Sequence, residues 1–247
     1  MEHIDFSRIF HQSSKDLSRG HPPIPEDPAD WPAEWKTRYY KSYPRLPKIA
    51  LPVDMKPQAD FFNLIGRRHS GREYHKQPLS ARELSALLKY SCGITGVAGD
   101  GLPRRAYPSG GARYPIEVYF FVFVSSEGLP TGVYHYDVKN HQLDTLWKRG
   151  FTAEEIAQLF LNEFVRGASA VVVMTAMFSR TQQKYGERGY RLTMLEAGHI
   201  GQNISLAAEA LGWQCCALGG TRDVAIETLL DIDGSTESVV YSLALGK

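Results

Sequence analysis

The chain is short of cysteine and carries almost no excess charge of either sign. Its 247 residues include three cysteines, two of them adjacent at Cys215 and Cys216, and 28 basic against 27 acidic side chains. An odd number with an adjacent pair is no disulfide framework, so we expect small apolar core residues in a reducing compartment. The near-neutral balance disfavours general nucleic-acid binding, which needs a clearly basic face. A local basic pocket for a phosphate is still allowed.

Long apolar runs are also missing, and so are several nucleotide and hydrolase motifs. No stretch approaches the ~18 uninterrupted apolar residues of a membrane span, and the first 30 residues show no secretory pattern. We therefore expect a soluble cytoplasmic protein. No Gly-x-Gly-x-x-Gly follows a strand, and neither Gly-Lys-Ser/Thr nor Gly-x-Ser-x-Gly occurs. These absences disfavour a Rossmann site, a P-loop and an α/β-hydrolase.

One pair of residues has metal-ligand spacing. Glu196 and His199 are three residues apart in a predicted helix, as in di-iron bundles. Such a site needs two pairs, and the sequence has one. We expect no metal, and interpret the pair as polar side chains hydrogen-bonded at a helix interface.

Proline is concentrated near the beginning of the chain. Nine of the fourteen prolines fall between Pro22 and Pro57, interspersed with tryptophan and tyrosine. Proline fixes φ and removes a backbone donor, so this stretch is not expected to be a run of helices. We predict an extended arm over residues 1–57 whose rings dock on a surface, such as that of a second subunit. A single domain is expected over residues 58–247.

Periodicity in the rest of the chain indicates an α+β fold with a central mixed sheet flanked by helices. Ser80 and Glu83 have capping-box spacing before an apolar stripe, and Thr152 with Glu155 repeats the pattern. The segments 116–124 and 170–177 are continuous apolar runs, typical of strands buried on both faces. Further elements are a hairpin over 132–137 and 141–147, a long helix over 190–211 and a last strand over 238–245.

Three segments have residues suited to chemistry. The first contains Arg68, Ser70 and Arg72, whose forked guanidinium donors and short hydroxyl match a phosphate. A solvated basic turn is an equally good interpretation of this segment by itself. The second, residues 108–115, has paired glycines beside Ser109 and Arg113, which suits close approach to a ligand or merely a tight turn.

The third segment begins with Lys184 and Tyr185. Lysine and tyrosine can transfer protons if burial or a neighbouring charge lowers their pKa. Without such an environment, an exposed charged loop is the ordinary interpretation.

In their order and type these segments resemble the nitroreductase superfamily, and are most similar to its SagB-type dehydrogenase domains, which include azoline oxidases. The resemblance covers roughly residues 60 to 246. It is carried by Arg68-His69-Ser70-Gly71-Arg72-Glu73-Tyr74, Pro108-Ser109-Gly110-Gly111-Ala112-Arg113-Tyr114-Pro115, Gly132-Val133-Tyr134-His135-Tyr136-Asp137, Lys184-Tyr185-Gly186-Glu187-Arg188-Gly189-Tyr190-Arg191 and Leu195-Glu196-Ala197-Gly198-His199-Ile200-Gly201-Gln202-Asn203.

The resemblance implies a homodimer with two FMN sites at the subunit interface. One subunit would hold FMN with Arg68, His69, Ser70 and Arg72. The partner would contribute Ser109, Gly110 and Arg113. The segment Leu218, Gly219 and Gly220 matches the family's backbone amides that face N5 and O4 of the flavin.

Two details of the expected cofactor site concern positive charge. A cation near N1–C2=O stabilises reduced flavin, and Arg72 is the candidate for that place. Many members of the family add basic residues after the last strand. Here only Lys247 stands there, with Arg67 as a possible substitute.

The resemblance also suggests a reaction. In azoline oxidases a Lys-Tyr pair at the position of Lys184 and Tyr185 is implicated in proton removal, while a thiazoline or oxazoline in a modified peptide gives hydride to FMN. We take this as the leading hypothesis. The alternatives are an NAD(P)H-dependent nitro- or quinone reductase and a non-catalytic flavin-binding scaffold of a biosynthetic complex. A biosynthetic partner protein is a further possibility.

Overall fold

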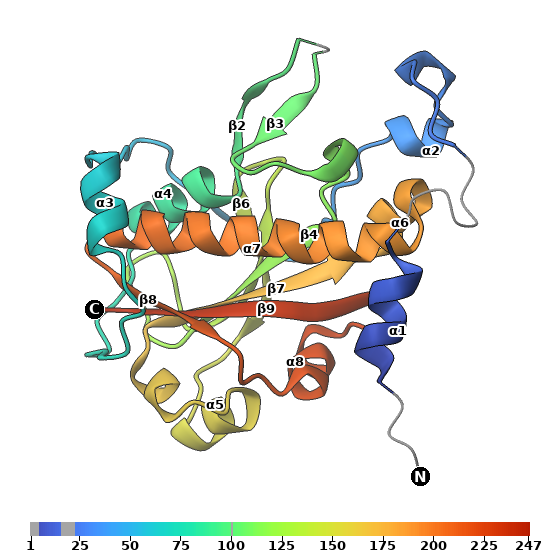
Figure 1. Cartoon of the computed structure of the whole chain (residues 1–247). Helices are drawn as coiled ribbons and strands as arrows, with labels where there is room; N and C mark the ends of the chain where they lie inside the picture. Colours follow the sequence, from blue (N-terminus) through green and yellow to red (C-terminus); the bar gives the residue numbers. More distant parts are fainter. Residues whose placement is uncertain (1–4, 16–22, 100) are drawn as a thin grey trace.

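A large antiparallel sheet organises the molecule, with helices on both faces (Figure 1). The computed structural model describes residues 5–15, 23–99 and 101–247. The sheet has seven strands in the order β1-β6-β5-β4-β7-β9-β8. Their bounds are β1 Lys48–Ala50, β4 Ile116–Val122, β5 Gly132–Asp137, β6 Gln142–Lys148, β7 Ala170–Met177, β8 Gln214–Leu218 and β9 Glu237–Gly246. A separate hairpin, β2 Ile94–Val97 with β3 Pro103–Arg105, projects from the body.

The helices divide between the two faces of the sheet. Their bounds are α1 Phe6–Ser13, α2 Ala33–Lys36, α3 Phe61–Arg67, α4 Ala81–Ser91, α5 Ala153–Leu159, α6 Ser179–Tyr185, α7 Glu187–Ala210 and α8 Asp223–Leu230. Helices α4 and α7 cover one face, and α5 and α8 cover the other. Each face has its own apolar core because side chains alternate along a strand. In β4, for example, Phe120 enters the first core and Phe121 the second.

Most of the predicted elements are confirmed. Both capping boxes form, Ser80 with Glu83 before α4 and Thr152 with Glu155 before α5. The two continuous apolar runs are β4 and β7 at the centre of the sheet, nearly all of their residues buried. The three cysteines are buried and unpaired, as expected.

The sheet and the N-terminal arm differ from expectation. The pairings between the seven strands are antiparallel, and parallel pairing occurs in the isolated bridge of Ser70 to Cys215. The arm is not uniformly extended, because it contains the eight-residue helix α1 and the single turn α2. Pro32 stands at the N-cap of α2 and so costs no helical hydrogen bond. The arm also contributes β1, the edge strand beside β6. Within the described residues, no helix is long and apolar enough to cross a membrane.

Candidate functional site

Two of the predicted site segments lie at the two ends of α7. Near its beginning, Gly110 approaches Leu192, so closely that an added Cβ would lie 3.3 Å from Leu192 Cδ1. Near its end, Arg67 pairs with Glu209 at 3.3 Å. Seventeen residues separate these contacts, or roughly 25 Å of helix at 1.5 Å per residue. One chain therefore keeps the Arg68 turn and the Ser109 loop well apart.

The Arg68 turn, which we define as residues 68–72, leaves α3 and runs beside β8. Ser70 bridges to Cys215, and Gly71 lies against Gln214, where a Cβ would come within 2.4 Å of the amide oxygen. His69, Ser70 and Arg72 are exposed, and Arg68 is half-buried. The guanidinium of Arg72 donates to Ser70 O at 3.2 Å. The turn is thus fixed in position while its donors face outward.

The segment Leu218–Gly220 continues the same strand. Gly219 is four positions after Cys215, the residue next to Ser70, or about 13 Å along the strand direction. Gly219 is exposed, and a Cβ there would meet nothing within 4 Å. Next to Gly220, the buried Oδ1 of Asn162 has no hydrogen-bond partner among the described residues. This end of β8 therefore offers open backbone and an unused acceptor.

The Ser109 loop, residues 109–113, is bent sharply and holds a buried arginine. Gly111 and Ala112 both have φ above +50°, a conformation that glycine tolerates best. Ser109 Oγ accepts from the amide of Tyr114 at 2.8 Å. Arg113, only 1% exposed, does not point outward: it donates to the carbonyls of Glu34, Trp35, Thr37 and Arg180. Its guanidinium therefore binds the arm to α6, and a flavin contact for it stays a prediction.

Lys184 and Tyr185 are the last residues of α6, and not an exposed loop. Lys184 is 2% exposed, and Tyr185 is half-buried. Both face Gly111, where an added Cβ would lie 2.7 Å from Tyr185 Oη and 3.3 Å from Lys184 Nζ. Position 111 therefore requires glycine, because a side chain there would clash with the Tyr185 hydroxyl group and press against the Lys184 amine.

The surroundings of this pair shift both pKa values. Burial, and after it the positive charge of Arg113, lowers the pKa of Lys184. Burial raises the pKa of Tyr185, and Arg113 opposes that rise. A lysine that loses its proton more readily than usual is suited to act as a base.

A buried ionic network fixes α6 to the sheet. His135, fully buried, lies 3.0 Å from both Asp144 and Glu117, and Glu117 pairs with Arg180 at 2.6 Å. Burial alone would raise the pKa of Glu117, but Arg180 and His135 hold it at about 2. Arg180 is one helical turn before Lys184, so the network sets the position of the Lys-Tyr pair. The sequence does not reveal that His135 is part of this network, because residues that pair across strands have no fixed spacing along the chain.

Glu196 is a second residue whose environment the sequence did not reveal. It is 2% exposed on α7, and neither carboxylate oxygen has a hydrogen-bond partner of good geometry among the described residues. Burial raises its pKa to about 8, although Ser109 and Arg105 act against the rise. The hydrogen-bonded interface predicted for Glu196 and His199 is therefore wrong: His199 is exposed, and Asn203 bonds elsewhere, to Ser91 O and Ala106 O.

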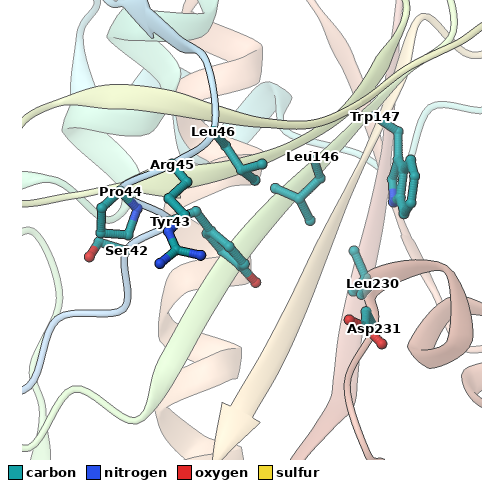
Figure 2. Close-up of a pocket in the computed structure, with 9 residues that line it drawn as sticks. All are labelled: Ser42, Tyr43, Pro44, Arg45, Leu46, Leu146, Trp147, Leu230 and Asp231. Carbon is teal, nitrogen blue, oxygen red and sulfur yellow. The ribbon is translucent and has the colours of Figure 1, made fainter.

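A separate cavity of about 580 Å³ is lined by other residues (Figure 2). The segment 42–46, the end of β6 and the end of α8 form it, and Leu46, Leu146 and Leu230 make its wall apolar. Trp147 donates its indole N–H to Leu229 O at 2.8 Å. None of the predicted catalytic or cofactor residues lines this cavity.

The two basic residues considered for completing a phosphate site are already paired. Lys247 donates to Glu83 at 2.8 Å and lies 4.7 Å from the Trp213 ring centroid. Arg67 pairs with Glu209, although its side chain is largely exposed. To bind a phosphate, each would have to exchange its existing partner for it.

The residues present fit a flavin phosphate better than a metal ion. The exposed guanidinium and hydroxyl donors of the Arg68 turn suit an anion, and the unused acceptor Asn162 Oδ1 suits a ring N–H. In the described part of the chain, no group of three or more His, Cys, Asp or Glu side chains could hold a metal.

Relatives of known name share both sequence and fold with this chain. MJ1384 of Methanocaldococcus jannaschii, named as a nitroreductase, is 34% identical over 170 residues, covering 69% of this chain and 83% of its own. The trifolitoxin-processing protein TfxB of Rhizobium leguminosarum bv. trifolii is 31% identical over 228 residues, which are 85% of this chain and 59% of that protein.

Two solved structures extend the comparison. The Escherichia coli microcin synthetase McbBCD complex, with truncated pro-MccB17 bound, contains a similar chain: TM-score 0.62 and 21% identity, covering 98% of this chain and 91% of that one. A nitroreductase from Exiguobacterium sibiricum in complex with FMN shares the fold, with TM-score 0.53 and 16% identity over 78% of this chain and 90% of that one. The model of the nitroreductase family matches residues 65–247. The family predicted from the motifs is therefore confirmed, and the chain belongs to the nitroreductase family.

Proposed function

We propose that the chain is an FMN-dependent oxidoreductase of the SagB type that dehydrogenates an azoline ring, with Lys184 and Tyr185 as the proton-accepting pair. The observation that carries the proposal is the packing of Lys184 Nζ and Tyr185 Oη against Gly111, inside the protein and beside Arg113. The trifolitoxin-processing protein TfxB is among the relatives, at 31% identity.

The reaction removes two hydrogens from the ring. A ring C–H bond breaks as its proton passes to the Lys-Tyr pair, and a second C–H leaves with its electron pair as hydride. FMN, when bound, would supply the acceptor for that hydride, with dioxygen as the final oxidant. Lys184 must be neutral to take the proton, which burial and the charge of Arg113 favour by lowering its pKa. Aromatisation of the ring supplies driving force.

We propose a homodimer in which each FMN is held by both subunits. The Arg68 turn and the Ser109 loop belong to opposite ends of α7, roughly 25 Å apart. A second copy, related by a two-fold axis, would bring its own Ser109 loop and Lys184 to the Arg68 turn of the first. Leu218, Gly219 and Gly220 lie at the end of β8, the strand that the turn runs beside, and so would serve the same flavin.

A biosynthetic partner is part of the proposal. The microcin synthetase structure is a complex of several proteins with a precursor peptide bound. We infer that this chain also receives its ring within a peptide presented by another protein.

The competing function is a reductase that oxidises NAD(P)H, favoured by the 34% identity to a protein named as a nitroreductase. An anaerobic stopped-flow experiment separates the two. We expect a thiazoline-containing peptide to bleach the flavin absorbance of the loaded protein, and NADH and NADPH to do so slowly. Fast bleaching by a nicotinamide, with none by the peptide, would assign the reductase function.

A further inference from the structure

The N-terminal arm covers Lys184 with tryptophan. Nζ of Lys184 lies 3.0 Å from the centroid of the Trp31 ring and 5.7 Å from that of Trp35. The indole N–H of Trp35 donates to Gln183 O at 3.1 Å, on the helix that carries Lys184. Figure 1 shows α2, which contains Trp35, beside α6. The proposed base is therefore closed off by its own chain.

Near α6 the arm is held through α2, while Trp31, which precedes α2, covers Lys184. Arg113 donates to the carbonyls of residues 34, 35 and 37, which fixes α2 and its end. Trp31 lies upstream of that attachment. Its own indole N–H bonds to Pro25 O at 2.9 Å, within the arm. Trp31 can therefore leave Lys184 without breaking any of the bonds that Arg113 makes.

A cavity lies on the other side of Trp31. It measures about 550 Å³ and is bounded by the arm, the β2–β3 hairpin and the Ser109 loop. Trp31, Trp35, Leu102 and Arg113 are among its lining residues, whereas Lys184 is not. The indole of Trp31 thus separates an open space from the buried ammonium group.

The charges around Lys184 make Trp31 its main stabilising contact. Arg113 and Arg180, both buried, are cations on the neighbouring loop and on the same helix. Tyr185 is the adjacent ionisable group on α6, and among the described residues no carboxylate forms an ion pair with Lys184. A ring face is therefore what favours the charged form, by a cation–π contact.

Resting on the proposed function, we propose that Trp31 is a gate: a planar azoline ring enters the cavity, displaces the Trp31 indole and takes its place on Lys184. Residues 34, 35 and 37, which follow Trp31 in the arm, stay bonded to Arg113. Displacement of the indole uncovers the base and removes its stabilising contact at the moment the ring arrives. The gate is a positioning residue, because it acts through Lys184.

The first test measures the chemical accessibility of Lys184 without turnover. Reductive methylation of the full chain, located by peptide mass spectrometry, should modify Lys184 about tenfold faster in Trp31→Ala than in the wild type. Tenfold corresponds to ~1.4 kcal/mol, within the range of a desolvated cation–π contact. Trp31→Phe should stay near the wild-type rate, because it keeps a ring. Exposed Lys148 serves as the internal standard. Equal rates in wild type and Trp31→Ala would overturn the gate.

The second test asks what takes the place of the indole. Thiazole-4-carboxamide, titrated by calorimetry, should bind Trp31→Ala about tenfold more tightly than wild type, because the ring no longer competes with Trp31. Trp147→Ala, which alters the separate cavity of Figure 2, should leave the affinity unchanged. Weaker binding to Trp31→Ala would show that Trp31 is a wall of the pocket, and would overturn the gate.

The two proposals fail separately. Faster labelling of Lys184 in Trp31→Ala without any thiazole binding would contradict the ring as occupant and, with it, the azoline substrate. Unchanged labelling, in a protein whose flavin a thiazoline peptide still bleaches, would remove the gate and leave the proposed function standing.

Discussion

The site residues at the two ends of α7 differ in their burial. At the Arg68 turn the side chains of His69, Ser70 and Arg72 are exposed, and their donors face outward. At the other end Lys184 is 2% exposed and Arg113 1%. The open end has the composition of a binding site for an anion, and the closed end has the burial that changes acid–base behaviour. The chain thus organises the proposed chemistry by itself and leaves the cofactor side to be completed.

The largest expected effect concerns the closed end. Lys184→Ala should lower turnover of a thiazoline peptide by about 10²- to 10⁴-fold, the usual contribution of a general base. FMN content, measured by absorbance after denaturation, should stay that of the wild type, since Lys184 is not among the predicted FMN contacts. Loss of flavin in this variant would place Lys184 in the cofactor site and remove the contrast between the ends.

The ionic network under the closed end should matter for stability. Glu117→Gln leaves Arg180 buried without its carboxylate, and we expect about 3–5 kcal/mol loss in the free energy of unfolding. Asp54→Asn, which breaks the exposed pair with Arg82, is the matched control and should cost about 1 kcal/mol or less. Urea titrations of both variants check this, and similar losses would mean that the buried network does not fix α6.

Substitutions in the Arg68 turn, at the open end, should change the affinity for FMN and not the turnover. Arg68→Ala should weaken FMN binding about 10- to 100-fold, since a hydrogen bond to a charged group contributes ~1.5–3 kcal/mol. Turnover at saturating FMN should be close to normal. Arg67→Ala, which removes the exposed pair with Glu209, should change the dissociation constant much less. Fluorescence titration of FMN measures both, and a larger effect of Arg67→Ala would make it the phosphate ligand.

The smallest expected effect concerns the contribution of the Lys247–Glu83 ion pair to stability. Burial would raise the pKa of Glu83, but hydrogen bonds from Lys247, Ser80 and Trp213 hold it at about 2, below its ordinary 4.5. The stabilisation is therefore complete above about pH 4.5 and is lost as the pH falls toward 2. Lys247→Ala should raise the folded pKa and flatten the loss of stability over that range. Urea titrations at several pH values check this, and an unchanged slope would mean that Lys247 is not engaged with Glu83.

Local signals were sufficient for most of the elements. The capping boxes at Ser80 and Thr152 and the apolar runs of β4 and β7 depend on neighbouring residues, so the sequence predicts them. The strand pairing could not be read in this way. A mixed sheet was expected, but antiparallel neighbours such as β7 and β9 are far apart along the chain, and only tertiary packing brings them together.

The site shows the same division. The motifs named Lys184 and Arg113, but not their surroundings. Burial of Lys184 under Trp31 joins positions 153 residues apart, and the turn of Arg113 toward the arm depends on three backbone carbonyls that carry no sequence signal. The spacing of Glu196 and His199 predicts a hydrogen-bonded interface, but the unsatisfied carboxylate of Glu196 arises from packing around the Ser109 loop, which no local pattern reveals.

The most direct test of the composite site is subunit complementation between its two ends. Arg68→Glu repels the flavin phosphate and Lys184→Ala removes the base, so each homodimer should be inactive with a thiazoline peptide at limiting FMN. Co-expression under two different tags and isolation of the mixed dimer should restore activity, because one of its two sites then combines an intact Arg68 with an intact Lys184 from the other subunit. A mixed dimer as inactive as its parents would contradict the account, since it would mean that both residues serve one flavin from the same chain.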